Sequence, residues 1–176
     1  MSAPGFRIRV AGDEPRLAGA LAQVLLDCVE GGASVSFMWP LPLHKALGFW
    51  VSVLGSAQRG ERIVLLAEDS ASGDVVGTVQ VVFAAPDNQP HRADVAKMLV
   101  HRRARRRGLG AALLGAAEPA ARAAGRTLLV LDTVSGGDAE RLYTRLGWQR
   151  LGIIPGYALW PRGGLCDTTY FYKTLV

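Results

Sequence analysis

The chain has few of the residues on which several classes of site depend. Only two of its 176 residues are cysteine and three are histidine. Cys28 and Cys166 have no spacing typical of metal ligands, so we expect free thiols and no metal site. No apolar run is long enough to cross a bilayer, and residues 1–16 lack the apolar segment of a signal peptide. The sequence therefore predicts a soluble, cytoplasmic protein with one domain over residues 1–176 and no membrane partner.

Lysine is scarce as well, and arginine carries most of the positive charge. Lysine occurs at three of the 20 basic positions, and the net charge is +5. Five of the six residues from 102 to 107 are arginine. A basic cluster is one sign of nucleic-acid binding, but here the remaining charges are mixed and no aromatic stripe alternates with them. We therefore expect no nucleic-acid partner, and a phosphate-rich small ligand near the cluster.

Hydrophobic periodicity predicts an alternation of strands and helices in the order β-α-α-β-β-β-α-β-α-β-β. The expected helices are residues 12–31, with the acids and proline of 13–15 in the first turn, then 40–60, 111–125 and 138–146. The expected strands are residues 6–10, 62–69, 75–84, 93–100, 127–133, 148–154 and 168–176. No linker, internal repeat or low-complexity tract interrupts this order.

A glycine-containing turn joins the strand at 93–100 to an alanine-rich helix. Its core is Arg105-Arg106-Arg107-Gly108-Leu109-Gly110. Glycine lets the backbone approach a ligand closely, and the free N–H groups of a helix start attract anions, so the run predicts a pyrophosphate site. A Walker loop would need Gly-Lys-Ser/Thr, but Ala111 follows Gly110. A dinucleotide fingerprint would need a third glycine where Leu113 stands.

This Arg-x-x-Gly-x-Gly run, together with the element order, resembles the GNAT acetyltransferase superfamily. The resemblance implies an α/β (α+β) fold, with a mixed central sheet whose splayed parallel strands are flanked by helices, and acetyl-CoA as the cofactor. It implies that the strand backbone at Met98, Leu99 and Val100 pairs with the pantetheine arm, with the N–H of Leu99 or Val100 polarising the thioester carbonyl. It also implies a set of residues that hold the pyrophosphate: Arg105, Arg106, Arg107, Gly108, Leu109, Gly110 and Ala111.

A second signature, GDAERLYTRLGWQRLG, resembles the superfamily helix that carries a tyrosine near the departing sulfur. Tyr143 is the match, and its phenol could protonate the CoA thiolate; plain aromatic packing is the alternative. An attacking amine must also lose a proton. At pH 7 the neutral form of a lysine-like amine costs about 4.6 kcal/mol. Asp94 and Asp132 lie on neighbouring strands and are the candidate bases, with His91 and His101 as weaker ones.

Several further segments, including GGASVSFM, RADVAKMLV and LGIIPGYALWPRGGLCDTTYFYKTL, resemble the tabtoxin-resistance acetyltransferases. That resemblance implies a carboxylate base at Asp94, where the relatives carry glutamate, and another at Asp132. The shorter Asp94 loses about 1.5 Å of reach, which favours a bridging water. Ser34, Phe37 and Tyr157 are the expected acceptor wall, and residues 31–38 suit a lid over a small substrate.

Together these features predict an acetyl-CoA-dependent N-acetyltransferase acting on a small-molecule amine, as a monomer or homodimer. An amino-acid-like or β-lactam toxin is the acceptor that the narrower resemblance favours. A peptide or protein amine is the alternative acceptor. A module that senses acetyl-CoA without turnover is the alternative of another class.

Overall fold

A computed structural model describes residues 4–175 of the chain. These residues form one mixed sheet of seven strands in the order β1-β2-β3-β4-β5-β7-β6. The strands are β1 (Phe6–Val10), β2 (Arg62–Asp69), β3 (Val75–Phe83), β4 (Arg92–Val100), β5 (Leu128–Val134), β6 (Gln149–Leu159) and β7 (Leu165–Thr174). The helices are α1 (Leu17–Glu30), α2 (Leu43–Gln58), α3 (Leu109–Ala123) and α4 (Asp138–Arg145), with a 3-10 turn η1 (Arg102–Ala104) before α3. Apart from η1, this order confirms the one expected from the sequence.

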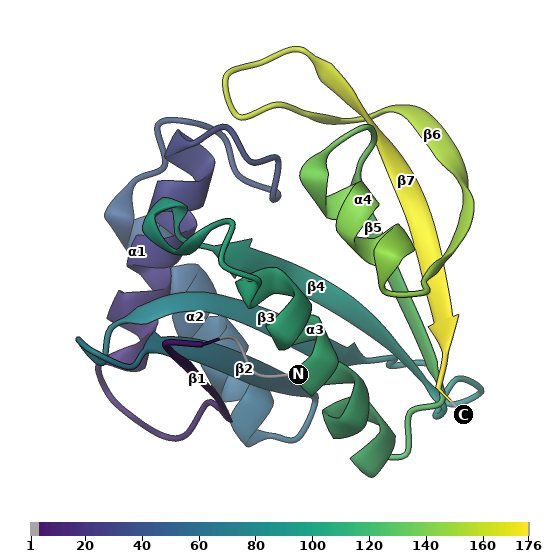
Figure 1. The fold of residues 1–176 in the computed structure, drawn as a ribbon, viewed down its shortest axis with the longest axis horizontal. Helices are drawn as coiled ribbons and strands as arrows, with labels where there is room; N and C mark the ends of the chain where they lie inside the picture. The colour runs from purple at the N-terminus through teal and green to yellow at the C-terminus, as the bar shows by residue number, and fades with distance from the viewer. Residues whose placement is uncertain (1–3, 176) are drawn as a thin grey trace.

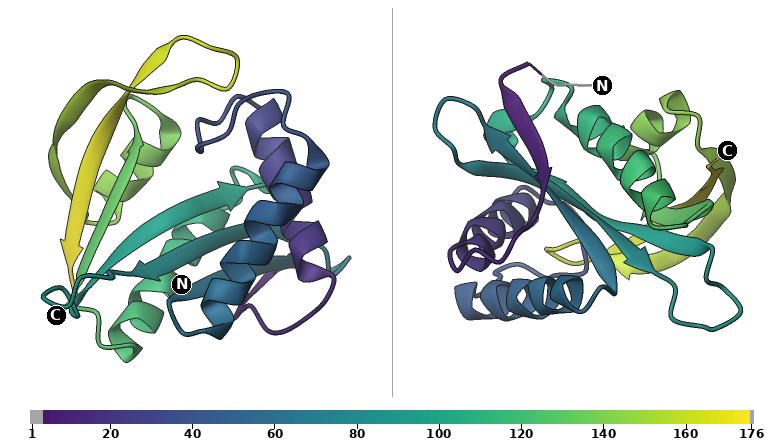
Figure 2. Two further views of the ribbon diagram at one scale, coloured as in Figure 1. Left: turned by 180° about the vertical axis from the view of Figure 1, so that it is seen from behind. Right: turned by 90° about the horizontal axis from the view of Figure 1, so that it is seen from below.

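Helices cover both faces of the sheet (Figures 1 and 2). On one face α1 and α2 bury a cluster that includes Leu21, Leu25 and Trp50. On the other face α3 and α4 bury a cluster that includes Leu113 and Phe171. Buried positions in α1 recur every three or four residues, so one side of the helix is apolar and packs on the sheet. Among the described residues, no helix combines the length and apolarity that crossing a membrane requires.

The only parallel pair in the described sheet, β4 with β5, separates after a short stretch. Pairing covers Arg92–Asp94 on β4 and Leu128–Val130 on β5. The two strands then diverge, and Figure 1 shows them close together near the C-terminus and apart at the other end. Backbone groups on the facing edges beyond Asp94 are thus not used in pairing these strands, which creates a place for a ligand. The expected mixed sheet with splayed parallel strands is confirmed.

Two helix starts lie later than the sequence indicated. The acids and proline of residues 13–15 precede α1 and are not in its first turn, because the Glu14 carboxylate binds Arg9 (2.7 Å) and holds this segment as a turn. α2 begins at Leu43 and not at Pro40. Two prolines, at 40 and 42, disfavour helical backbone in the residues before them.

The last hairpin is longer than expected. β6 continues to Leu159 across a register shift between Ile154 and Ala158, and β7 begins at Leu165. Pro155 and Gly156 interrupt the apolar alternation, which made the strand seem to end there. The Asp167 carboxylate accepts the Gly156 N–H (2.8 Å) and keeps the hairpin together across the interruption.

Candidate active site

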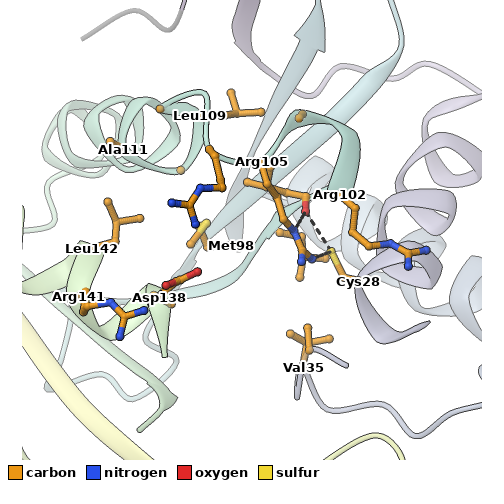
Figure 3. A pocket seen from close by; sticks show the side chains of 18 of the residues that line it. Cys28, Val35, Met98, Arg102, Arg105, Leu109, Ala111, Asp138, Arg141 and Leu142 are labelled. Atoms are coloured by element: carbon orange, nitrogen blue, oxygen red, sulfur yellow. Dashed lines mark hydrogen bonds and ion pairs between the residues drawn. The ribbon is translucent and has the colours of Figure 1, made fainter. Parts of the chain in front are cut away.

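A cavity of about 1040 Å³ lies at the end of β4, beyond its paired stretch with β5, and Figure 3 shows side chains that line it. It is bounded by the end of β4, the turn before α3, the α4 helix, the C-terminal end of α1 and the segment that follows α1. The lining residues are Cys28, Ala33, Val35, Met98, Leu99, Val100, Arg102, Ala104, Arg105, Arg106, Gly108, Leu109, Gly110, Ala111, Asp138, Ala139, Arg141, Leu142 and Arg145.

The start of α3 presents free backbone donors to this cavity. Gly108 caps the helix in the left-handed region (φ 76°), which glycine adopts without strain. The first intrahelical bond runs from the Ala112 N–H to the Gly108 carbonyl (3.1 Å). Helix geometry therefore leaves the N–H groups of Leu109, Gly110 and Ala111 for an anion, aided by the helix dipole.

Gly110 has a second reason to be glycine, which is close packing. A Cβ added there would lie 3.1 Å from Leu142 Cδ2 and 3.7 Å from Met98 Sδ. The missing side chain thus lets the start of α3 approach both α4 and β4. The same residue lines the cavity, where its N–H is one of the free donors of the helix start.

The arginines of the turn have different positions and partners. Arg105 and Arg106 line the cavity. The Arg105 Nε donates to the Val100 carbonyl (3.0 Å), so this side chain ties the turn to the end of β4. Arg107, also expected at the pyrophosphate, points elsewhere. Its guanidinium lies 4.2 Å from the Phe6 ring centroid, outside the cavity lining.

The neighbouring Arg102 and Arg103 form ion pairs with carboxylates of the same chain. Arg102 pairs with Asp27 (2.8 Å) and with Glu30, and Arg103 pairs with Asp74 (2.7 Å). Three arginines that line the cavity have no carboxylate of residues 4–175 within 4.0 Å, namely Arg105, Arg106 and Arg145. Their charge is thus available to an anionic ligand.

The α4 contribution was missed by the sequence analysis. Asp138, Arg141 and Arg145 recur at helical spacing and lie on the cavity side. That spacing was the signal that could have found them. Cys28 in α1 was also missed. It is nearly fully buried, its thiol points at the Val100 carbonyl (3.5 Å), and burial raises its pKa, which keeps it a neutral wall residue.

The end of β4 offers one backbone amide to the opening. His101 N–H donates to the Val76 carbonyl (2.9 Å), so Val100 occupies the non-hydrogen-bonded position against β3. The N–H and carbonyl of Val100 therefore point away from β3. The carbonyl is taken by Arg105, and the N–H faces the cavity. By the same register the Leu99 amide faces β3, so of the two N–H groups that the sequence left open, that of Val100 is available.

Tyr143 lies in α4 beside the cavity but not among its lining residues. Its ring packs against Trp148 (5.8 Å between centroids) and Phe171 (5.9 Å), and only 5% of the residue is exposed. This is the aromatic packing that the sequence offered as the alternative. Burial, and secondly the charge of Asp132, raises the pKa of the phenol, which is therefore protonated at neutral pH.

The two candidate bases lie on the sheet face covered by α1 and α2. The adjacent Ala93 and Leu131 are buried in the cluster on the face covered by α3 and α4, so the alternation of side chains turns Asp94 and Asp132 to the opposite face. Asp94 forms an ion pair with Arg92 (2.6 Å). Asp132 is exposed and accepts a hydrogen bond from the Thr168 hydroxyl (3.0 Å).

A tyrosine pair lies near both carboxylates. The Tyr170 and Tyr157 hydroxyls are 2.9 Å apart. This hydrogen bond, with burial and the charges of Asp132 and Asp94, raises the pKa of Tyr170 to about 12. The structure thus brings Tyr157, expected in the acceptor wall, to the same region as the two candidate bases.

The other two acceptor-wall residues lie in the segment after α1. The Ser34 hydroxyl donates to the Leu159 carbonyl of β6 (2.8 Å), joining this segment to the last hairpin. The Phe37 ring packs edge-on against Phe49 of α2 (5.2 Å) and is half-buried. Residues 31–38 therefore bridge the gap between α2 and β6. Among residues 4–175, no cluster of three or more histidine, cysteine, aspartate or glutamate side chains could hold a metal ion.

Comparison with known proteins shows what this geometry resembles. Residues 59–150, just over half of the chain, match the family described as acetyltransferase (GNAT) domain. An N-acetyltransferase from Staphylococcus aureus Mu50 superposes with a TM-score of 0.81 at 17% identity, covering 97% of this chain and 99% of that one. A protein from Salmonella typhimurium, solved with its cofactor acetyl-CoA, has a TM-score of 0.76 at 21% identity and coverages of 98% and 95%. A ribosomal-protein-alanine N-acetyltransferase from Brucella melitensis has a TM-score of 0.78 at 23% identity and coverages of 96% and 99%.

Proposed function

Because the chain belongs to the GNAT acetyltransferase family, which uses acetyl-CoA, we propose that it is a cytoplasmic N-acetyltransferase of small-molecule amines. Transfer would be direct, within a ternary complex of enzyme, acetyl-CoA and amine. The observation that carries the proposal is one continuous cavity that joins the free N–H groups of α3 to the free Val100 N–H. The candidate bases lie beyond it, on the side of the splay that α1 and α2 cover.

The cavity residues fit acetyl-CoA by charge and by hydrogen bonding. The N–H groups of Leu109, Gly110 and Ala111, with the unpaired Arg105 and Arg106, would hold a pyrophosphate. The diverging backbone of β4 would hold the pantetheine arm. The Val100 N–H would hold the thioester carbonyl oxygen and stabilise the charge that develops on it during attack. Acetyl-CoA itself supplies the activated acetyl group.

Asp132 is the base that the geometry favours. Removing the proton from a lysine-like amine at pH 7 costs about 4.6 kcal/mol, and a nearby carboxylate offsets part of that cost. Asp94 is already neutralised by Arg92, whereas Asp132 makes only a neutral hydrogen bond to Thr168. In the transfer, the amine nitrogen bonds to the acetyl carbon as the carbon–sulfur bond breaks. Asp132 or Asp94, directly or through a water, takes the proton that the nitrogen loses.

Tyr143 is the group we propose for the departing thiolate. Its phenol is protonated at neutral pH and can give a proton, or a strong hydrogen bond, to the sulfur. Its raised pKa makes complete transfer less favourable than donation of a hydrogen bond. A Tyr143→Phe variant should therefore slow turnover without abolishing it.

The acceptor is a small molecule in our proposal because residues 31–38, the lid segment, are fixed by contacts to neighbouring elements. Ser34 bonds to Leu159, and Phe37 packs on Phe49, so this segment is held against both β6 and α2. Resemblance to the tabtoxin-resistance acetyltransferases favours an amino-acid-like or β-lactam toxin. A protein amine is the second candidate, since the Brucella neighbour is named for alanine of ribosomal proteins.

The test is release of free thiol from acetyl-CoA over a panel of amino acids, β-lactam amino acids, aminoglycosides and short peptides. We expect turnover with small amines, falling about 10²- to 10⁴-fold in kcat for Asp132→Asn with unchanged affinity for acetyl-CoA. Asp94→Asn is the matched control, with the smaller loss expected. Turnover of peptides alone would favour the second candidate. Tight acetyl-CoA binding without turnover of any amine would indicate a sensor and contradict the proposal.

A further inference from the structure

Lys97 occupies an unusual position on β4. The β3–β4 register shifts between Thr78 and Gln80, so that Lys97 and Met98 together oppose one residue of β3. Lys97 itself has φ 49°, a conformation that non-glycine residues seldom adopt. A bulge of this kind re-aims side chains and is frequent beside active sites.

The bulge determines which face of the sheet Lys97 serves. Ala93 and Val95 are buried against α3, and regular alternation would turn residue 97 the same way. Instead the Lys97 ammonium lies 5.9 Å from the centroid of the Phe49 ring in α2. The extra residue therefore moves this charge to the face that carries Asp94 and Asp132.

A second strained residue meets the first. Three non-glycine residues among residues 4–175 have positive φ, namely Ser36 (75°), Lys97 (49°) and Arg106 (60°). Arg106 lies in the turn before α3, and the other two are in contact, with the Lys97 Nζ donating to the Ser36 hydroxyl (3.0 Å). Strained backbone is retained where the structure gains function from it. The contact between residues 31–38 and β4 thus joins two residues that both have left-handed backbone.

The Lys97 ammonium is only partly compensated. It has three donors, and its one side-chain partner in the described structure is the Ser36 hydroxyl. No carboxylate of residues 4–175 lies within 4.0 Å of it, whereas Lys173 pairs with Glu118 at 2.7 Å. Burial lowers the pKa of Lys97, and the charge of Asp132 opposes that shift, which places the two groups in the same region. A partly buried cation with free donors is stabilised by an anion.

We propose that Lys97, held by Ser36, binds the carboxylate of an amino-acid acceptor whose amine faces Asp132 and Asp94. This inference rests on the proposed function and names the acceptor class: a molecule that carries both an amine and a carboxylate. On one face of the sheet, the Lys97 ammonium then meets the carboxylate of the acceptor, and Asp132 and Asp94 meet its amine. Opposite charges at two ends also orient the amine toward the opening of the cavity.

The experiment compares common L-amino acids with their amides and their decarboxylated amines, by thiol release from acetyl-CoA. For wild type we expect kcat/KM for the acid to exceed that for its amide by about 10- to 100-fold, the range for a charge-assisted hydrogen bond. In Lys97→Met this ratio should fall to near 1, mainly through KM of the acceptor. Lys97→Arg should restore part of the preference, and Lys45→Met, on an exposed part of α2, should retain it.

The outcomes separate this inference from the proposed function. Turnover of amides and plain amines at rates equal to those of the acids, or an undiminished ratio in Lys97→Met, would overturn the role of Lys97 while leaving the acetyltransferase assignment intact. Failure of every amine would overturn the assignment itself. Thermal unfolding and acetyl-CoA titration are run for each variant. If Lys97→Met does not fold, Ser36→Ala replaces it, and a ratio unchanged in Ser36→Ala counts against the inference.

Discussion

Replacing Arg106 should weaken acetyl-CoA binding, and replacing Arg103 should not. The two arginines are close in sequence and both are exposed. Arg106 lines the cavity with no carboxylate of the described chain in range, whereas Arg103 is already paired with Asp74 at 2.7 Å. The two substitutions therefore test whether the position of an arginine, and not the number of positive charges, determines the affinity for acetyl-CoA.

The expected size follows from the exposure of the side chain. A hydrogen bond to a charged group contributes about 1.5–3 kcal/mol, and solvent screening places Arg106 at the lower end. About 1.5 kcal/mol corresponds to a roughly tenfold rise in Kd for Arg106→Ala. Loss of the exposed Arg103–Asp74 pair should have little effect on stability, because solvent screens it, and should leave the Kd for acetyl-CoA unchanged.

Isothermal titration of each variant with acetyl-CoA measures this difference. The difference in Kd for acetyl-CoA between the two variants should become smaller at high salt, because the screening length falls from about 8 Å at 0.15 M to about 3 Å at 1 M. Equal weakening by both substitutions would mean that net charge attracts the ligand without a specific contact. No weakening by Arg106→Ala would refute the placement of the pyrophosphate at this turn.

Three further predictions concern stability and the residues around the cavity. Gly108→Ala should cost about 1–2 kcal/mol in urea unfolding, because the added methyl meets open space and only the left-handed backbone opposes it. Gly48→Ala, in the middle of α2 and equally uncrowded, should instead stabilise by about 1 kcal/mol; the same sign for both would contradict the backbone argument. Burial raises the pKa of Asp27, but hydrogen bonds from the backbone N–H and the side chain of Arg102 outweigh it, so the net pKa is lowered. The contribution of Asp27 to stability is therefore present at pH 7 and lost as pH falls through that lowered pKa. Asp27→Asn should thus be less stable than wild type at pH 7 and approach it near pH 3, and a pH-independent difference would count against this. Arg107→Ala should lose about 0.5–1 kcal/mol of stability with its stacking on Phe6 while changing acetyl-CoA affinity less than twofold, as calorimetry would show.

Features that depend on neighbouring residues were predictable from the chain. The turn at Arg105–Gly110 is one, because free N–H groups and a left-handed glycine are properties of a few consecutive residues. The structure places both ends of that run in the cavity wall. The order of elements is another, since each depends on the periodicity of its own apolar residues. The boundaries were less accurate at α1 and β6, where a partner on a neighbouring strand, Arg9 of β1 or Asp167 of β7, contacts the segment.

The positions of individual side chains at the site depended on contacts that sequence spacing does not contain. Arg107, in the turn before α3, was expected at the pyrophosphate, but its guanidinium packs on the ring of Phe6 in β1, outside the cavity. Tyr143 matches the family pattern, and its burial against Phe171 follows from where β7 lies. Lys97 gave no sequence signal, because a bulge is a relation between two strands and not a pattern within one.

The sequence by itself determined the class of fold, the glycine-containing turn before α3 and the family, because each is specified by local patterns of apolar, glycine and arginine residues. Only the tertiary structure decided which charges remain free for ligands, which amide faces the opening, and that Lys97 shares a face with Asp132. These depend on the register between strands and on ion pairs between residues far apart in the chain. A single shifted residue in β4 turns a side chain from one face of the sheet to the other.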